Sequence, residues 1–194
     1  MVNIIASRVV LDALGASDFG LYNVVGGIVI LLNVVNTAML ATTYRYLAFE
    51  IGKKLGGNPN KIFNTSLLIH AVFAIGLITV GIAVGDWYIC NYLNIVPDKI
   101  SDAIFVFHIS IITAALSTLF VPFQGLQVAY EKFTVNAAID IISQSIKLAA
   151  IILLIYSDTN RLRLYSMIML SYTFFSCVLY VGYCVMHYLS LIHI

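Results

Sequence analysis

Long apolar stretches separated by short polar turns run through the whole chain. All but the first are about as long as the 20 or so helical residues that a bilayer crossing needs, and glycine, proline or charged residues lie between them. We therefore predict an all-α fold, a polytopic transmembrane bundle of about six helices that forms one N-terminal lobe over residues 1–188. The expected helices cover residues 1–14 (the remaining part of a truncated first helix), 19–49, 62–89, 101–130, 134–156 and 164–188. We expect residues 189–194 to be a non-native tail.

Breaks and small residues modify this pattern. Gly15 is expected to end the first helix, and Pro122 to bend the fourth because proline removes a backbone hydrogen bond. The glycines of the third helix are expected to let another helix approach closely. They are Gly76, Gly81 and Gly85.

Two of the apolar stretches carry polar residues at helical spacing. Such a stripe has no use on a helix that only faces lipid, because an amide without a partner in hydrocarbon is costly. An ionised side chain at mid-bilayer costs at least about 2.5–3.5 kcal/mol on insertion scales. We therefore expect both stripes to face a wet cavity. The first contains Asn23, Asn33 and Thr37, and the second contains Asn136, Asp140, Ser143, Gln144 and Lys147.

Other polar residues in apolar surroundings allow two readings. Arg8 and Asp12 lie one helical turn apart, and either neutralise each other near the interface or serve a function in the cavity. His70 is interpreted as a neutral, hydrogen-bonded packing residue.

Composition excludes a soluble domain. The chain is 61% hydrophobic and only 10% charged, whereas soluble domains carry about 25% charged residues. The net charge of +1 and the lack of a basic run give no reason to expect nucleic acid. The three cysteines form no metal-ligand pattern, and no catalytic motif stands out, so we expect neither a metal, a cofactor nor an enzyme.

Basic residues predict the orientation. The 52–61 loop carries three lysines, which marks it as cytoplasmic if positive charge favours the inside. Alternation of the helices then assigns five basic residues inside (Arg45, Lys53, Lys54, Lys61 and Lys132) and three outside (Lys99, Arg161 and Arg163).

Four segments resemble a known family. They are RVVLDALGASDFGLYNVVGGIV from Arg8, ATTYRYLAFEIGK, NPNKIFNTSLLIH and VPFQGLQVAYEKF. They are similar to bacterial polysaccharide-biosynthesis flippases of the multidrug/oligosaccharidyl-lipid/polysaccharide exporter superfamily. The resemblance implies two lobes around a central cavity, alternating access, and a cargo such as an O-antigen or capsule repeat unit on polyprenyl diphosphate.

The same resemblance implies partners and site residues. The partners would be the lipid-linked oligosaccharide, membrane lipids and a C-terminal lobe of the same protein, in the bacterial plasma (inner) membrane. Asp12 and Asp140 would serve ion coupling or charge pairing. The residues expected to bind substrate are Arg8, Arg45, Lys147, Asn23, Asn33, Thr37, Asn136 and Gln144.

Three other functions remain open from the sequence. A cation-coupled multidrug exporter of the same superfamily would favour an acidic lumen, whereas this one mixes both signs of charge. A membrane-embedded glycan ligase or polymerase would need a long external loop, and the longest loop expected here has about ten residues. A structural or assembly subunit would have no need for the polar stripe in residues 134–156.

Overall fold

The predicted all-α class is confirmed. A computed structural model describes the backbone of residues 2–53, 56–157 and 159–192, and the side chains of residues 6–27, 34–53, 56–157 and 159–188. Within these ranges there are six α-helices, one short 3₁₀ helix and no strand. The elements are α1 (Val2–Gly52), α2 (Pro59–Asn91), η1 (Pro97–Lys99), α3 (Ile100–Leu119), α4 (Val121–Ala129), α5 (Phe133–Leu154) and α6 (Arg161–Ile192).

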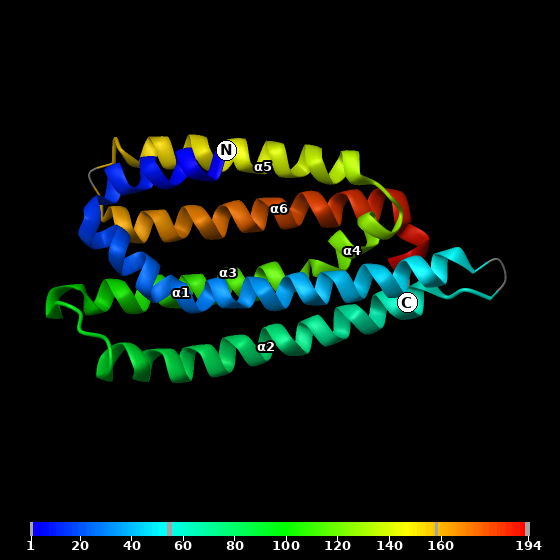
Figure 1. Cartoon of the computed structure of the whole chain (residues 1–194), viewed down its shortest axis with the longest axis horizontal. Coiled ribbons are helices and arrows are strands. Elements are labelled where there is room, and N and C mark those ends of the chain that lie inside the picture. Colours follow the sequence, from blue (N-terminus) through cyan, green and yellow to red (C-terminus); the bar gives the residue numbers. More distant parts are fainter. Residues whose placement is uncertain (1, 54–55, 158, 193–194) are drawn as a thin grey trace.

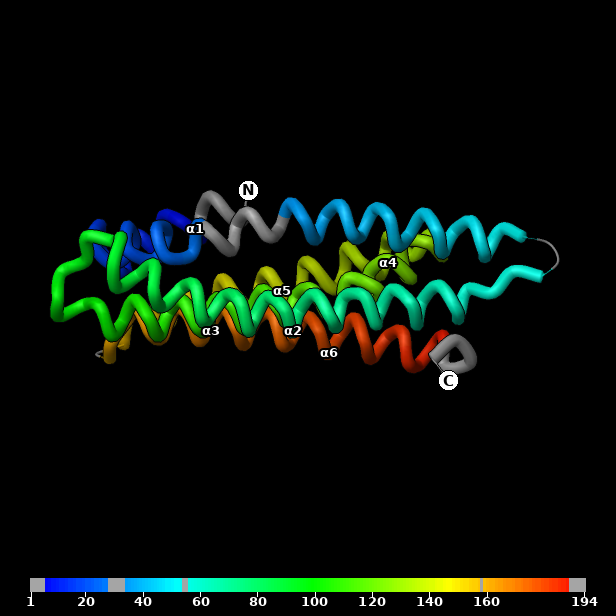
Figure 2. Tube along the Cα trace, turned by 90° about the horizontal axis from the view of Figure 1, so that it is seen from below, coloured from blue at the N-terminus to red at the C-terminus, as the bar shows by residue number. Residues whose placement is uncertain are grey.

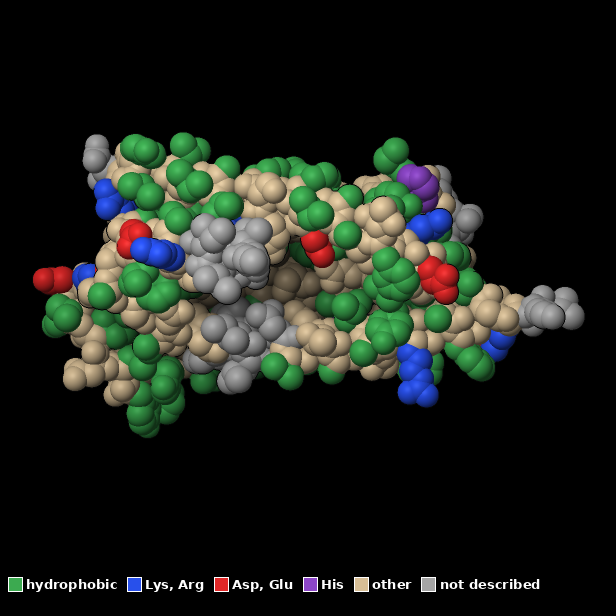
Figure 3. All heavy atoms as spheres, turned by 45° about the horizontal axis from the view of Figure 1, so that its top comes forward, with side chains coloured by type: hydrophobic (Ala, Val, Ile, Leu, Met, Phe, Trp, Pro, Cys, Tyr) green, Lys and Arg blue, Asp and Glu red, His purple; other side chains and the backbone are tan. Residues whose placement is uncertain are grey.

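The helices have the length and apolar character of a multi-pass membrane protein. Four described segments meet both criteria: Pro59–Asn91, Pro97–Ala129, Phe133–Leu154 and Arg161–Tyr188. Charged side chains gather near the two ends of the molecule, and apolar side chains dominate the band between them (Figure 3). This distribution suits a bundle whose middle lies in hydrocarbon.

Two breaks shape the bundle. Gly15 has φ 77° and ψ 166° inside α1, in a region of φ that L side chains rarely adopt, so the helix ends and restarts there as predicted. The predicted helix over 101–130 is instead two helices, α3 and α4, separated at Phe120. Pro122 lies in the first turn of α4, where its missing N–H would have no helical partner in any case.

Four helices form a row that α1 covers. In Figure 1, α2, α3, α6 and α5 follow one another across the molecule, and each contacts the next. Figure 2 shows α1 along one face of this row. The segment of α1 before Gly15 folds back beside α5 and α6, where Val10 and Leu14 are buried in a cluster with Ile151 and Leu162.

The connections alternate between two ends of the bundle. At one end, called here the Gly15 end, lie the break in α1, residues 92–99, and residues 155–157 and 159–160 (Figure 1). At the opposite end, the Gly52 end, lie the end of α1, the start of α2 and the α4–α5 turn. The helices therefore cross the same layer in alternating directions, as the sequence pattern predicts.

Close contact between α2 and α3 depends on glycine at two positions. A Cβ atom at Gly85 would lie 1.8 Å from Cε1 of Phe107, and one at Gly81 would lie 2.9 Å from Cδ1 of Ile111. The prediction that these glycines allow close approach is confirmed. For Gly76 it is wrong, because a Cβ there would meet nothing within 4 Å.

Candidate functional site

A polar seam lies among α1, α3, α5 and α6. It consists of two adjoining cavities of about 400 Å³ and about 240 Å³, which share Tyr22, Asn23, Tyr165 and Met169. The face that carries α5 and α1 is hollowed near its middle (Figure 3). The polar side chains that line the seam are Ser7, Tyr22, Asn23, Ser110, Thr113, Ser117, Lys147, Tyr165, Ser166, Tyr172 and Thr173.

Helical spacing brings the α3 hydroxyls to one side of the seam. Ser110, Thr113 and Ser117 are three and four residues apart and so share a face of α3. The hydroxyl of Thr113 donates to the carbonyl of Ile109 at 2.7 Å, and that of Ser117 donates to the carbonyl of Ala114 at 2.8 Å. Because these hydroxyls use their own hydrogens within the helix, their oxygens can only accept further hydrogen bonds, and that of Ser117 already accepts one from Asn36.

An amide joins α1 to α3 beside the seam. The Asn36 amide nitrogen donates to the Ser117 hydroxyl at 3.2 Å, and its carbonyl oxygen accepts from the Thr118 hydroxyl at 2.9 Å. Thr118 is fully buried. Interhelical hydrogen bonds of this kind hold helices together in hydrocarbon, so Asn36 fixes the wall that α1 contributes.

Lysine and tyrosine side chains form the opposite wall. Nζ of Lys147 lies 4.9 Å from the centre of the Tyr172 ring, in cation–π geometry. The Gln144 amide donates to the Tyr172 hydroxyl at 3.2 Å, and the Tyr180 hydroxyl donates to an Asp140 carboxylate oxygen at 2.9 Å. Tyrosines of α6 therefore organise the polar stripe of α5.

Lys147 is the buried cation of this wall. Only 8% of the residue is exposed, and it lines the smaller cavity. A lysine so far from water is tolerated when it faces a cavity or a partner. An ammonium group with three donors beside acceptor-rich walls is suited to an anionic, hydroxyl-bearing ligand.

The structure places part of the predicted site at the seam. Asn23 and Lys147 line it, and Gln144 reaches it through Tyr172, whereas Asp140 accepts from Tyr180, which lines neither cavity. Asn136 lies one turn before Asp140, and its buried Oδ1 has no hydrogen-bond partner among the described residues.

The other predicted residues lie apart from this group. Arg8 and Asp12 are both exposed on the first segment of α1, and among the described residues no ion pair joins them. Arg45 is exposed about 45 Å along α1 from Gly15, at 1.5 Å per residue. Thr37 is exposed, and the side chain of Asn33 lies outside the described residues. The two arginines are therefore not brought together.

The contribution of α6 to the seam was not among the predictions from the sequence. Tyr165 and Tyr172 are seven residues apart, as are Ser166 and Thr173, and all four line the seam. The spacing of seven could have indicated a common lining face on α6, because residues at that spacing share a helix face. Aromatic residues are so common in this chain that the spacing did not stand out.

The histidines that the structure describes lie outside the seam. Nδ1 of His70 donates to the carbonyl of Ser66 at 2.6 Å, so this residue is buried and hydrogen-bonded, as predicted. Nε2 of His108 lies 2.7 Å from an Asp86 carboxylate oxygen and joins α3 to α2. In the described part of the chain, no three His, Cys, Asp or Glu residues are grouped so that they could hold a metal ion.

Comparisons with protein-family models, with curated proteins and with solved structures find no match. The candidate site therefore rests on its own geometry and chemistry.

Proposed function

We propose that this chain forms a lobe of a flippase that moves a lipid-linked oligosaccharide across the bacterial inner membrane by alternating access. The observation that supports the proposal is the polar seam, a space lined by hydroxyl groups, an amide and a buried lysine inside a bundle of membrane-length helices.

The chemistry of such a cargo matches the seam. Its sugars and diphosphate cannot enter hydrocarbon, whereas its polyprenyl chain can remain in the bilayer. The hydroxyl oxygens of α3 and α6 would replace water around the sugar hydroxyls. Lys147 would offset phosphate charge, since a charge-assisted hydrogen bond is about twice as strong as a neutral one. Transport of this kind needs no catalytic residue.

Alternating access requires one end of the bundle to open while the other is closed. At the Gly15 end, Asp18 pairs with Lys99, and Asp102 pairs with Arg163 at 2.6 Å. These pairs join segments far apart in sequence, yet they are partly exposed. Exposed ion pairs contribute only about 0–1 kcal/mol each, so the contacts are weak enough to exchange during a transport cycle.

The resemblance noted in the sequence supplies the rest of the proposal. A second lobe would complete the cavity, and Arg8 and Asp12, exposed on the first segment of α1, would face it. Asn23 would contact the sugars, Gln144 would position the Tyr172 hydroxyl that lines the seam, and Asp140 would hold Tyr180 of α6.

Deletion of the gene tests the proposal directly. Cells without the protein should lose surface polysaccharide and accumulate lipid-linked repeat units whose sugars face the cytoplasm. A deletion of the first glycosyltransferase of the same polysaccharide is the control, because it should remove the surface polymer without such accumulation. Accumulation of units whose sugars face outward would contradict a flippase and indicate a ligase or polymerase. Normal polysaccharide with increased drug sensitivity would indicate a multidrug exporter.

A further inference from the structure

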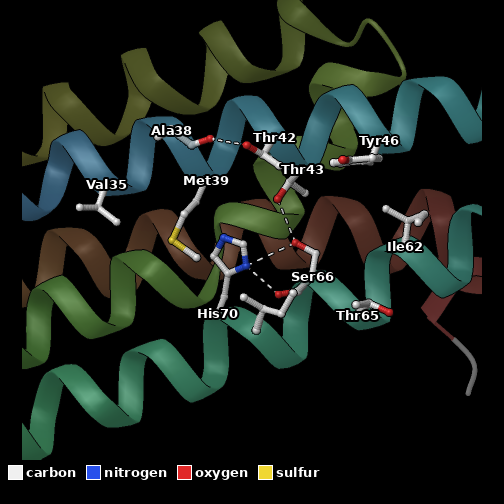
Figure 4. A pocket seen from close by; sticks show the side chains of 11 residues that line it. Val35, Ala38, Met39, Thr42, Thr43, Tyr46, Ile62, Thr65, Ser66 and His70 are labelled. Atoms are coloured by element: carbon white, nitrogen blue, oxygen red, sulfur yellow. Dashed lines mark hydrogen bonds between the residues drawn. The ribbon is translucent and has the colours of Figure 1, made fainter.

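A second cavity of about 460 Å³ lies between α1 and α2, away from the polar seam. We call it the lateral groove. Its walls carry Val35, Met39 and Tyr46 from α1 and Ile62, Ile69 and His70 from α2 (Figure 4). None of these residues lines either cavity of the seam.

The groove opens toward the lipid. Ile69 is 55% exposed and belongs to the outer face of α2, where Leu68, Val72 and Ile75 are exposed as well. These exposed side chains are apolar and belong to a bundle of membrane-length helices, so acyl chains should cover them. The groove is continuous with this face through Ile69.

Several polar groups of the groove are hydrogen-bonded within the protein, although the buried Nε2 of His70 has no partner among the described residues. The hydroxyls of Thr43 and Ser66 hydrogen-bond to each other at 2.9 Å, and Nδ1 of His70 donates to the carbonyl of Ser66 (Figure 4). The hydroxyl of Thr42 donates to the carbonyl of Ala38 at 2.9 Å. Because these groups bond to one another and aliphatic or aromatic side chains supply most of the remaining wall, the groove presents a largely apolar lining that suits hydrocarbon better than water.

The mouth of the groove is basic. The lining residues nearest the Gly52 end are Tyr46 and Ile62. Arg45 precedes Tyr46 and Lys61 precedes Ile62, and both basic residues are exposed. Lys53 lies two turns beyond Tyr46 and pairs with Glu50 at 2.5 Å. Three cations against one carboxylate leave this mouth positively charged.

We infer that the lateral groove holds one chain of an anionic phospholipid from the surrounding bilayer, with the phosphate near Lys61 and Arg45. The assignment depends on how apolar and charged residues are arranged along the groove. An apolar channel about 16 Å long, from Val35 to Tyr46 at 1.5 Å per residue, ends at a cationic mouth. A basic residue near the membrane surface attracts anionic lipid by about 1 kcal/mol, or about fivefold in binding. A bilayer lipid can occupy this groove whether or not the chain moves oligosaccharides.

Native mass spectrometry of the purified whole chain tests the assignment, with palmitoyl-oleoyl phosphatidylglycerol and phosphatidylcholine as the added lipids. The wild-type chain should retain phosphatidylglycerol in preference to phosphatidylcholine. Thr42→Trp and, independently, Val35→Trp should fill the groove and abolish retention. Thr79→Trp is the matched control, since Thr79 is also an exposed α-helical threonine that donates to the carbonyl four residues before it, but it lines neither the groove nor the seam. Far-ultraviolet circular dichroism should show equal helix content in all three variants.

The headgroup part is tested with Lys61→Gln, which should reduce the preference for phosphatidylglycerol about fivefold. Lys61→Arg should keep the preference, as should Lys132→Gln at the same end of the bundle. Equal retention by Thr42→Trp, Val35→Trp and Thr79→Trp would overturn the inference. So would preferential retention of a polyprenyl phosphate when that lipid is added beside phosphatidylglycerol. None of these results depends on polysaccharide export, so they are separate from the test of the flippase.

Discussion

The polar seam and the lateral groove are similar in size but opposite in chemistry. The larger seam cavity has a volume of about 400 Å³ and the groove about 460 Å³. Hydroxyls, an amide and the nearby Lys147 line the seam, whereas aliphatic and aromatic groups dominate the groove. Since α1 forms a wall of both, two segments of one helix serve two different environments: lining residues between 6 and 26 border the seam, and those between 35 and 46 border the groove.

The difference shows how a membrane helix can carry polar residues without instability. In the seam the polar groups lie inside the bundle, where other helices and enclosed space surround them. In the groove the polar groups of Thr43 and Ser66 are paired within the protein, and apolar groups line the side that meets lipid. The location of each polar group relative to the bundle therefore decides whether it can bind a ligand.

Replacement of the seam cation should have the largest effect. Lys147→Met keeps the length of the side chain but removes its charge, and a hydrogen bond to a charged group contributes about 1.5–3 kcal/mol. We expect the rate at which lipid-linked oligosaccharide appears on the outer leaflet to fall by about 10- to 100-fold. Ile146→Met is the control, because Ile146 is a neighbouring exposed residue of α5. Equal rates for both variants would show that the seam is not the cargo site.

Stability of Lys147→Met separates a functional loss from misfolding. A buried lysine is costly to desolvate, and an apolar replacement of similar volume is often neutral or stabilising. The variant should therefore unfold in mixed micelles at the same denaturant concentration as wild type, or a higher one. A marked loss of stability would mean that Lys147 serves the packing of α5 against α6.

The α2–α3 contact should be the next most sensitive feature. Gly85→Ala would force Phe107 to move, and overpacking of this kind costs about 1–3 kcal/mol. Gly76→Ala is the matched change on the same helix, and it should be neutral or stabilise by up to about 1 kcal/mol, since no atom lies within 4 Å of the new Cβ. The free energy of unfolding measures both. If the two variants were equally stable, α3 would not be what holds α2 in place beside the groove.

Thiol labelling should distinguish the polar stripe of α5 from the lateral groove by their solvent. With the native cysteines replaced, cysteine at Asn136 or Asp140 should react with a water-soluble maleimide in membrane vesicles. Cysteine at Thr42 or Ile69 in the groove should react only with a lipid-soluble reagent. We expect rates that differ several-fold rather than an absolute contrast, because proteins open transiently. Protection of both α5 positions would remove the wet character of the α5 stripe.

The smallest effect should come from a substitution of Glu50 at the groove mouth, measured as the pH dependence of unfolding. Hydrogen bonds from Lys53 and from the backbone N–H of Asn58 lower the pKa of Glu50 below its ordinary value of 4.5. A carboxylate with a lowered pKa contributes stability above pH 4.5, and that stability is lost as the pH falls through the folded-state pKa. Glu50→Gln should remove this part of the pH dependence of unfolding. The change should be slight because exposed ion pairs are weak, and an unchanged acid profile would show that the pair does not form.

Helical class and the positions of the breaks could be predicted from the chain. The length of each apolar stretch fixes the number of helices, and Gly15 and Pro122 act locally through their own backbone geometry. Prediction was less successful where the outcome depends on a partner helix. Gly76 and Gly85 are the same residue type on the same helix, yet only Gly85 meets a neighbour.

For the candidate site too, some features could be predicted from the sequence and others depended on the packing of the helices. The sequence by itself determined that Asn23, Gln144 and Lys147 lie on polar stripes, because helical periodicity is a local property. Only the tertiary structure decided that α6 tyrosines complete the wall, that Arg8 and Arg45 lie far apart along α1, and that α1 also borders an apolar groove. Periodicity gives the direction of a side chain relative to its own helix axis. Which surface meets that side chain depends on how the helices pack, and packing is set by contacts between residues far apart in the chain.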